Sequence, residues 1–235
     1  MIFCKTKTGN FHRNNQKPCE DAVRYEETDG LVTAVVADGA TACLFGGEGA
    51  RLAAEAALDF VRKEKDFIFE YTDKKLCYLL TEHILYMIEK YAGHDADNNE
   101  YGSTLMMTAM RKKDGKTVIV KIGNGKCTVQ KENGIYDPFE RCSINRLSYL
   151  TTTKHSYLAG MVWHEQLKDG EYILMCTDGM LSVLKKHTRT SVTHSLEQTA
   201  PLKLMNYINE ADENDDMSFL MLIRNAVDEQ TEKID

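Results

Sequence analysis

Two aspartates in this sequence directly follow an apolar run, and each is followed by a glycine. Asp38 ends the run that includes residues 35–37, and Asp178 ends the run 172–177. A β-branched run that a glycine stops is typical of a largely buried strand leading into a tight turn. Burying a carboxylate there is costly unless it meets a cation or hydrogen-bond donors. A turn or helix cap would explain a single such Asp, but the repetition favours a metal-binding or catalytic role.

Glu20 is a third carboxylate at a strand border. Residues 22–26 and 31–38 are predicted to form two strands joined by a short turn. Because antiparallel strands joined in this way have their outer ends side by side, we expect Glu20 and Asp38 at the same end of the sheet. Two carboxylates that lie side by side repel each other unless something positive lies between them.

Asp215 completes the set, at the beginning rather than the end of a strand. It precedes the apolar strand predicted over 219–223. The start of one antiparallel strand lies beside the end of its neighbour, so we expect Asp215 to share an edge with Asp38 and Asp178. A cluster of carboxylate oxygens suits hard divalent cations such as Mg²⁺ and Mn²⁺. Two such ions about 3.5–4 Å apart hold a bridging water as hydroxide and stabilise an in-line displacement at phosphorus.

The remaining predicted elements support these strands. Apolar residues at helical spacing predict amphipathic helices over 50–61 and 76–91, the first with a small-residue face suited to close packing on a sheet. His83 lies within the second apolar stripe, and we interpret it as a core residue rather than a ligand. A polar loop is predicted over 9–18, whereas 137–169 show no pattern that assigns secondary structure. Further predicted elements are strands over 2–8, 102–110, 117–122 and 126–131 and a helix over 200–211.

Composition limits the class of protein. The 235 residues are 43% hydrophobic and 28% charged, with a formal net charge of −7, which is typical of a globular protein and argues against a nucleic-acid partner. No stretch has the length and apolar character of a membrane span or a secretory signal, so we expect a cytoplasmic protein without a membrane partner. The simplest account is one α+β domain over residues 1–225 with a charged tail at 226–235.

Other motifs favour no competing chemistry. The seven cysteines include no close pair, so neither a zinc ribbon nor a redox motif is indicated, and we expect reduced, mostly buried thiols. The glycine-rich stretch 46–49 lacks the Lys-Ser/Thr of a phosphate-binding loop, so nucleotide binding is not favoured.

The order and neighbours of these motifs resemble those of the metal-dependent serine/threonine protein phosphatases of the type-2C, or PPM, class, particularly the compact bacterial members. The resemblance spans residues 9–223. It is carried by six short motifs in the family's order: Glu20-Asp21-Ala22, Val35-Val36-Ala37-Asp38-Gly39, Gly102-Ser103-Thr104-Leu105, Gly123-Asn124-Gly125, Cys176-Thr177-Asp178-Gly179 and Asp215-Asp216-Met217-Ser218.

This resemblance implies a four-layer α-β-β-α sandwich of two antiparallel sheets flanked by helices. It also implies a centre of two Mg²⁺ or Mn²⁺ ions, with a bridging hydroxide as the nucleophile and with Asp38, Asp178 and Asp215 as catalytic residues. The metal ligands that it implies stand at strand ends: Asp38 between both ions, Glu20 and the carbonyl of Gly39 at one ion, and Asp178 and Asp215 at the other. Asp21 and Asp216 would orient these ligands from the next layer of residues.

Three positions differ from the pattern of many family members. Ala40 stands where those members have a histidine that can protonate the leaving group, Gln16 stands where they have a phosphate-binding arginine, and Asn124 stands where they have an aspartate implicated in a third metal site. His12 or Arg13 could replace the phosphate contact, although each is more simply interpreted as a solvated loop residue.

The resulting hypothesis is a metal-dependent phosphatase, expected to be a monomer, that acts on phosphoserine or phosphothreonine in a phosphorylated protein substrate. The alternative is a catalytically weak pseudophosphatase that serves as a signalling binding module. The residues also leave open a metal-dependent hydrolase of a small phosphate ester.

Overall fold

The computed structural model of the protein describes residues 1–28, 30–140, 150–188 and 201–225. In this part of the chain the strands form two antiparallel five-stranded sheets. One sheet has the order β1 (Ile2–Lys7), β10 (Met217–Ile223), β9 (Tyr172–Cys176), β6 (Lys126–Lys131) and β7 (Gly134–Tyr136). The other has the order β2 (Asp21–Glu27), β3 (Leu31–Asp38), β4 (Leu105–Arg111), β5 (Lys116–Ile122) and β8 (Met161–Gln166).

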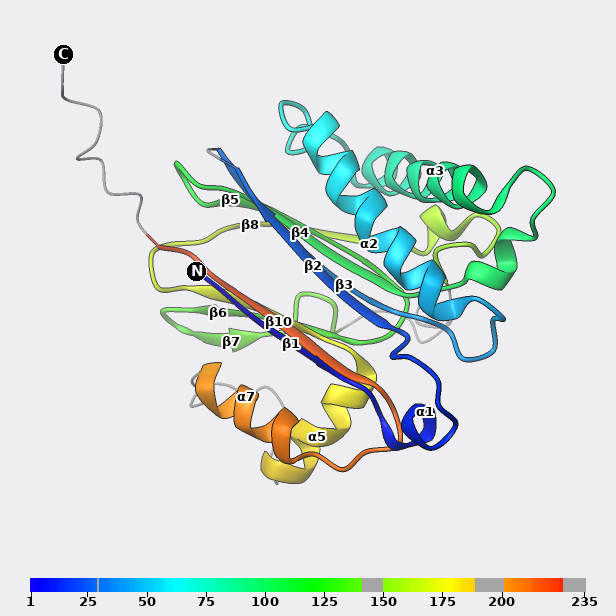
Figure 1. Cartoon of the computed structure of the whole chain (residues 1–235). Helices are drawn as coiled ribbons and strands as arrows, with labels where there is room; N and C mark the ends of the chain where they lie inside the picture. Colours follow the sequence, from blue (N-terminus) through cyan, green and yellow to red (C-terminus); the bar gives the residue numbers. More distant parts are fainter. Residues whose placement is uncertain (29, 141–149, 189–200, 226–235) are drawn as a thin grey trace, which may run out of the picture.

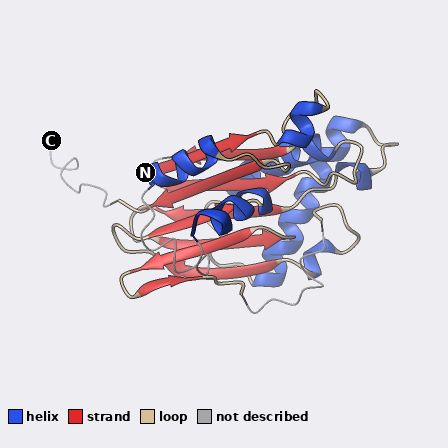
Figure 2. Cartoon of the chain, turned by 90° about the horizontal axis from the view of Figure 1, so that it is seen from below, coloured by secondary structure: helices blue, strands red, loops and turns tan. Residues whose placement is uncertain are grey.

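Helices cover the outer face of each sheet, so the molecule has four layers (Figure 1). The sheet that contains β3 is covered by α2 (Gly46–Lys63) and α3 (Asp73–Ala92), and the sheet that contains β10 by α5 (Asp178–Thr188) and α7 (Pro201–Glu210). Seen from below, the strands run side by side across the molecule (Figure 2). The predicted α+β, α-β-β-α sandwich is therefore confirmed. Connections carry the short helices α1 (Asn10–Asn14), η1 (Asn98–Tyr101) and η2 (Ser156–Leu158).

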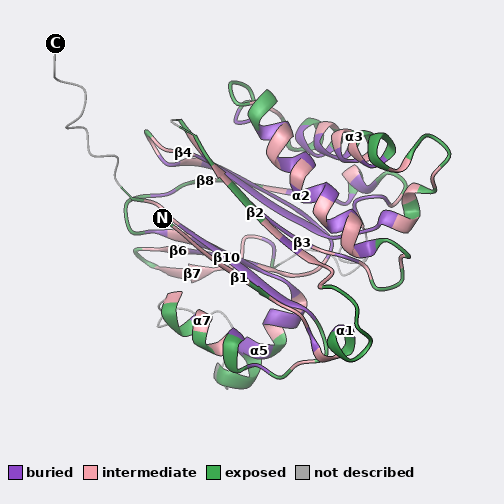
Figure 3. Cartoon of the chain, viewed as in Figure 1, coloured by how far each residue is buried: buried purple, intermediate pink, exposed green. Residues whose placement is uncertain are grey.

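Three apolar clusters fill the spaces between the four layers, and the buried residues concentrate there (Figure 3). The alternation of side chains along β3 divides this strand between two of them. Val35 and Ala37 belong to the cluster under α2 and α3, whereas Ala34 and Val36 belong to the cluster between the sheets. Because β3 is buried on both faces, its sequence reads as a continuous apolar run.

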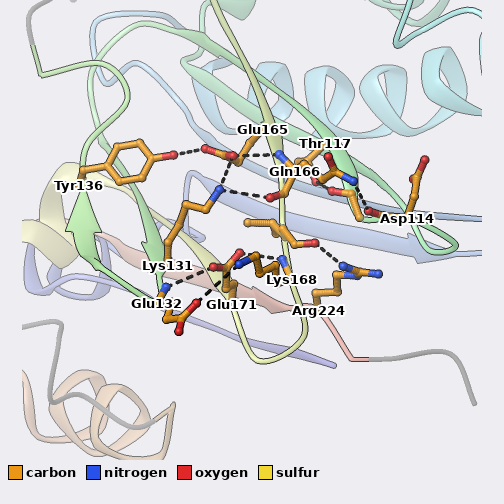
Figure 4. Close-up of polar contacts among 12 residues, drawn as sticks. Asp114, Thr117, Lys131, Glu132, Tyr136, Glu165, Gln166, Lys168, Glu171 and Arg224 are labelled. Atoms are coloured by element: carbon orange, nitrogen blue, oxygen red, sulfur yellow. Dashed lines mark hydrogen bonds and ion pairs between the residues drawn. The ribbon is translucent and has the colours of Figure 1, made fainter.

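Polar contacts connect the two sheets at the end away from Asp38 (Figure 4). Lys131 of β6 lies 2.6 Å from a carboxylate oxygen of Glu165 on β8, and the hydroxyl of Tyr136 on β7 donates to the same carboxylate. Glu171, which is 6% exposed, accepts hydrogen bonds from backbone amides of two turns at 2.7 and 3.2 Å. These contacts fix how the strands of the two sheets face each other, and so where their opposite ends meet.

Some elements differ from the sequence prediction. Residues 137–169 receive no assignment from the sequence, yet β8 lies among them; it is an edge strand that pairs only with β5, so its pattern is weak. The polar loop predicted over 9–18 contains α1, and α5 has no counterpart in the prediction. Residues 141–149 and the predicted tail at 226–235 lie outside the described residues.

The described cysteines and helices bear on the thiols and the membrane span considered from the sequence. All the cysteines that the structure describes are free thiols, and Cys77, Cys127 and Cys176 are buried; Cys142 lies outside the described residues. None of the helices in the described ranges combines the length and apolar character that a membrane span requires.

Candidate active site

Glu20 and Asp38 lie at the same end of the β2–β3 hairpin. Asp38, the last residue of β3, is directly opposite Asp21 in the ladder, and the amide of Gly39 donates to the carbonyl of Glu20 at 3.0 Å. The chain packs closely here because residue 39 has no side chain: a Cβ on it would lie 2.5 Å from a backbone carbon of Gly46. The hairpin thus places Glu20 and Asp38 together, as its turn and register require.

Asp178 and Asp215 reach this end from the other sheet. Because β9 and β10 are antiparallel neighbours, the residues that follow β9 lie beside those that precede β10. Gly179 permits the close approach, since a Cβ on it would lie 2.0 Å from the carbonyl oxygen of Asp216. Asp178 is also the first residue of α5, and the N-terminal end of a helix favours negative charge.

Carboxylates from the two sheets approach one another around Asp178, whose charge acts on both Asp38 and Asp215. Burial, together with the charges of Asp21 and Asp178, raises the pKa of Asp38 to about 10. Burial and the charge of Asp178 also raise the pKa of Asp215. Folding therefore collects negative charges that oppose one another, and a cation among them would relieve the repulsion.

Thr177 links Asp21 to the opposite sheet. Its hydroxyl donates to Asp21 Oδ2 at 3.0 Å and accepts a hydrogen bond from the amide of Ser218 at 3.0 Å. Burial raises the pKa of Asp21 to about 7, against the opposing effect of its hydrogen bonds with Ser218 and Thr177. One buried hydroxyl thus connects the start of β2 with the start of β10, next to the meeting point of the carboxylates.

Asp216 organises the N-terminal segment around its own carboxylate, which is 3% exposed. It accepts hydrogen bonds from the backbone amides of Gly9 at 2.7 Å and Glu20 at 2.6 Å, and it lies 2.8 Å from Nδ1 of His12. The interpretation of His12 as a solvated loop residue is wrong, because α1 and Asp216 enclose it and leave it 3% exposed. The side chain of Arg13 is 44% exposed and bonds within α1.

The chemistry of the donors fits a hard divalent cation. Buried side-chain oxygens that lack a hydrogen-bond partner in the described chain include Glu20 Oε2, Asp21 Oδ1 and Asp178 Oδ1. As the side chains stand, no three Asp, Glu, His or Cys residues in the described ranges already converge into one coordination shell. An ion would therefore have to draw these carboxylates together.

Comparison with known proteins identifies the family. The model of the family described as protein phosphatase 2C matches residues 8–213. The chain belongs to this family. No curated protein sequence matches it significantly.

Solved structures of bacterial phosphatases share the fold of this protein phosphatase 2C chain. Stp1, a serine/threonine phosphatase from Staphylococcus aureus, has a TM-score of 0.67 and 16% identity, with 94% of each chain covered. The phosphatase domain of SpoIIE from Bacillus subtilis has a TM-score of 0.59 and 14% identity, covering 100% of this chain and 96% of that one. RsbX in complex with magnesium has a TM-score of 0.65 and 12% identity, covering 94% and 92%.

Of the three positions that differ from the pattern implied by the resemblance, Asn124 contacts one of the carboxylates. Asn124, in the turn between β5 and β6, donates its amide to Asp178 Oδ2 at 2.7 Å. The turn takes this shape with φ of 89° at Gly123 and 87° at Gly125, a region that glycine adopts readily. Ala40 offers only backbone polar groups, and its amide donates to the carbonyl of Gly102 at 3.0 Å.

Proposed function

We propose that this protein is a divalent-metal-dependent phosphatase that hydrolyses phosphoserine and phosphothreonine on proteins. The carrying observation is the approach of carboxylates from two sheets, where burial and the charge of Asp178 raise the pKa values of Asp38 and Asp215. Buried oxygens of Glu20 and Asp178 have no hydrogen-bond partner within the described chain. Such a cluster is unfavourable by itself and favourable around divalent cations. Membership of the protein phosphatase 2C family supports the same chemistry.

The proposed cofactor is a pair of Mg²⁺ or Mn²⁺ ions, and magnesium is the ion in the RsbX complex. Bound ions would supply a hydroxide nucleophile and neutralise charge on the phosphate. The chain's own residues hold and orient this centre: Thr177 positions Asp21, and Asp216 positions Glu20 through its backbone amide. The residues proposed as ligands are Asp38 for both ions, Glu20 and the carbonyl of Gly39 for one, and Asp178 and Asp215 for the other.

The test measures hydrolysis of an aryl phosphate and of phosphothreonine peptides, with millimolar Mn²⁺ and with a chelator. We expect turnover that requires the metal and that falls at least about a hundredfold in Asp38→Asn. Asp66→Asn is the matched control, because Asp66 is an exposed residue in the connection between α2 and α3, and it should retain full activity.

Two outcomes would contradict the proposal. One is a protein that hydrolyses neither substrate with Mn²⁺ present, and the other is an Asp38→Asn variant with intact activity. Metal binding without turnover would instead support the binding module, the alternative suggested by Ala40, Gln16 and Asn124.

A further inference from the structure

His12 is a buried imidazole that lies among the carboxylates of the proposed centre. It belongs to α1 and is 3% exposed. Its Nδ1 lies 2.8 Å from Asp216 Oδ2, and its Nε2 lies 3.6 Å from Glu20 Oε2. The ring therefore stands between one carboxylate that orients it and another at the metal-binding edge.

Asp216 determines which ring nitrogen of His12 carries the proton. An ionised carboxylate only accepts hydrogen bonds, and Asp216 already accepts them from the amides of Gly9 and Glu20. The Nδ1 of His12 is therefore the donor of the 2.8 Å contact. In the neutral imidazole this leaves Nε2 with a free lone pair aimed at Glu20.

The contact between Nε2 and Glu20 is not a hydrogen bond. Its 3.6 Å separation is beyond hydrogen-bond range, and within the described chain both His12 Nε2 and Glu20 Oε2 are buried without a partner. When the imidazole is neutral, its nitrogen lone pair and the carboxylate oxygen facing it repel each other unless a cation lies between them. Metal–nitrogen and metal–oxygen bonds of about 2.1 Å allow two ligands of one ion to be about 3 to 4 Å apart, which matches the observed separation.

We propose that His12 is a metal ligand, binding through Nε2 the same divalent ion that Glu20 binds. The inference rests on the proposed function in assuming that this edge of the protein holds metal ions. Asp216 then acts as the carboxylate that fixes the tautomer and direction of a metal-binding histidine. A nitrogen donor makes this site mixed rather than all-oxygen, so it selects transition-metal ions over Mg²⁺, which prefers oxygen ligands.

Pulsed electron paramagnetic resonance of the Mn²⁺-loaded protein tests the nitrogen ligand directly. A bound imidazole gives ¹⁴N modulation, and labelling the histidines with ¹⁵N in the wild-type protein replaces that signal without any mutation. Of the histidines that the structure describes, only His12 contacts the carboxylates of the proposed centre; His83, for example, pairs with Asp59. Expected results are ¹⁴N modulation in the unlabelled protein and its loss on labelling.

Calorimetric titration with Mn²⁺ and with Mg²⁺ gives a second readout. His12→Asn keeps an N–H donor for Asp216 but removes Nε2. We expect it to weaken Mn²⁺ binding at least about tenfold, with a smaller loss for Mg²⁺, so that the ratio of the two affinities falls. His83→Asn is the matched control and should leave both affinities unchanged.

The outcomes separate this inference from the proposed function. Bound Mn²⁺ without ¹⁴N modulation, or an unchanged affinity ratio in a His12→Asn variant with the wild-type circular dichroism spectrum, overturns the role of His12 and leaves the phosphatase proposal standing. A protein that binds neither ion contradicts both. If His12→Asn does not fold, the isotope experiment on the wild-type protein still decides the question.

Discussion

Asn124 donates its side-chain amide to Asp178 across 2.7 Å, between the β5–β6 turn and the first residue of α5. The contact gives Asp178 a neutral partner at a place where its own charge also acts on the carboxylates of Asp38 and Asp215. A carboxylate at position 124 would add one more negative charge to the same cluster. The amide therefore lets Asp178 be oriented without increasing the repulsion that the metal-free protein must tolerate.

Replacing Asn124 by Asp should make the free energy of unfolding more dependent on bound metal. In the presence of a chelator we expect the free energy of unfolding to fall by about 1 kcal/mol or more, because a hydrogen-bond donor becomes a like charge beside Asp178. Added Mn²⁺ should stabilise this variant more than the wild-type protein. Denaturant unfolding with and without Mn²⁺ measures both effects. Asn133→Asp, at an exposed turn, is the control; equal losses in the two variants would contradict this account.

Asp38→Asn should raise the stability of the metal-free protein and remove its stabilisation by metal. Without metal, the raised pKa of Asp38 means that folding near neutral pH must protonate its carboxylate at a cost in free energy. Asparagine resembles that protonated form without the cost, so the chelator-treated variant should be more stable than the wild type by about 1 kcal/mol. The same change should abolish the rise in melting temperature that Mn²⁺ causes in the wild type. Thermal unfolding with chelator and with Mn²⁺ checks both statements. A variant that is less stable without metal would show that Asp38 does not experience net repulsion.

Thr177 and Thr128 offer a matched pair of buried hydroxyls. The Thr177 hydroxyl bonds both Asp21 and the Ser218 amide, whereas the Thr128 hydroxyl has no partner in the described chain although Thr128 is 0% exposed. We expect Thr177→Val to lower the free energy of unfolding by about 2 kcal/mol, because it leaves buried polar groups unpaired. Thr128→Val should be neutral or stabilising. Urea denaturation measures the change in the free energy of unfolding for each variant. Similar changes at the two positions would rule out the proposed role of the Thr177 hydroxyl.

Ala40→His should supply the proton donor that the resemblance to the phosphatase family leads us to expect at this position. A general acid helps most when the leaving group is poor, so kcat for a phosphothreonine peptide should rise about tenfold or more. Hydrolysis of an aryl phosphate, whose leaving group departs readily, should change much less. Steady-state kinetics on both substrates at several pH values test this expectation. An equal change for both substrates would show that the new histidine acts through structure rather than proton donation.

The elements that carry Asp38 were predictable because short-range patterns specify them. The turn at 28–30 and the apolar run of β3 fix a hairpin, and the pairing of Asp21 with Asp38 follows from its register. The helical spacing of α2 and α3 is equally local. Edge strand β8 was missed because a strand paired on one side, with half-exposed polar residues, has no comparable pattern.

The sequence by itself determined that several carboxylates stand at strand borders, that the strands are mostly antiparallel neighbours, and which family the motifs resemble. Only the tertiary structure decided which of these carboxylates meet. Asp38 ends β3 of one sheet and Asp178 follows β9 of the other, so their proximity depends on how the two sheets pack across the central apolar cluster. The burial of His12 likewise depends on Asp216, 204 residues away. Local propensity cannot encode such contacts, because they arise from packing between elements that are distant in the chain.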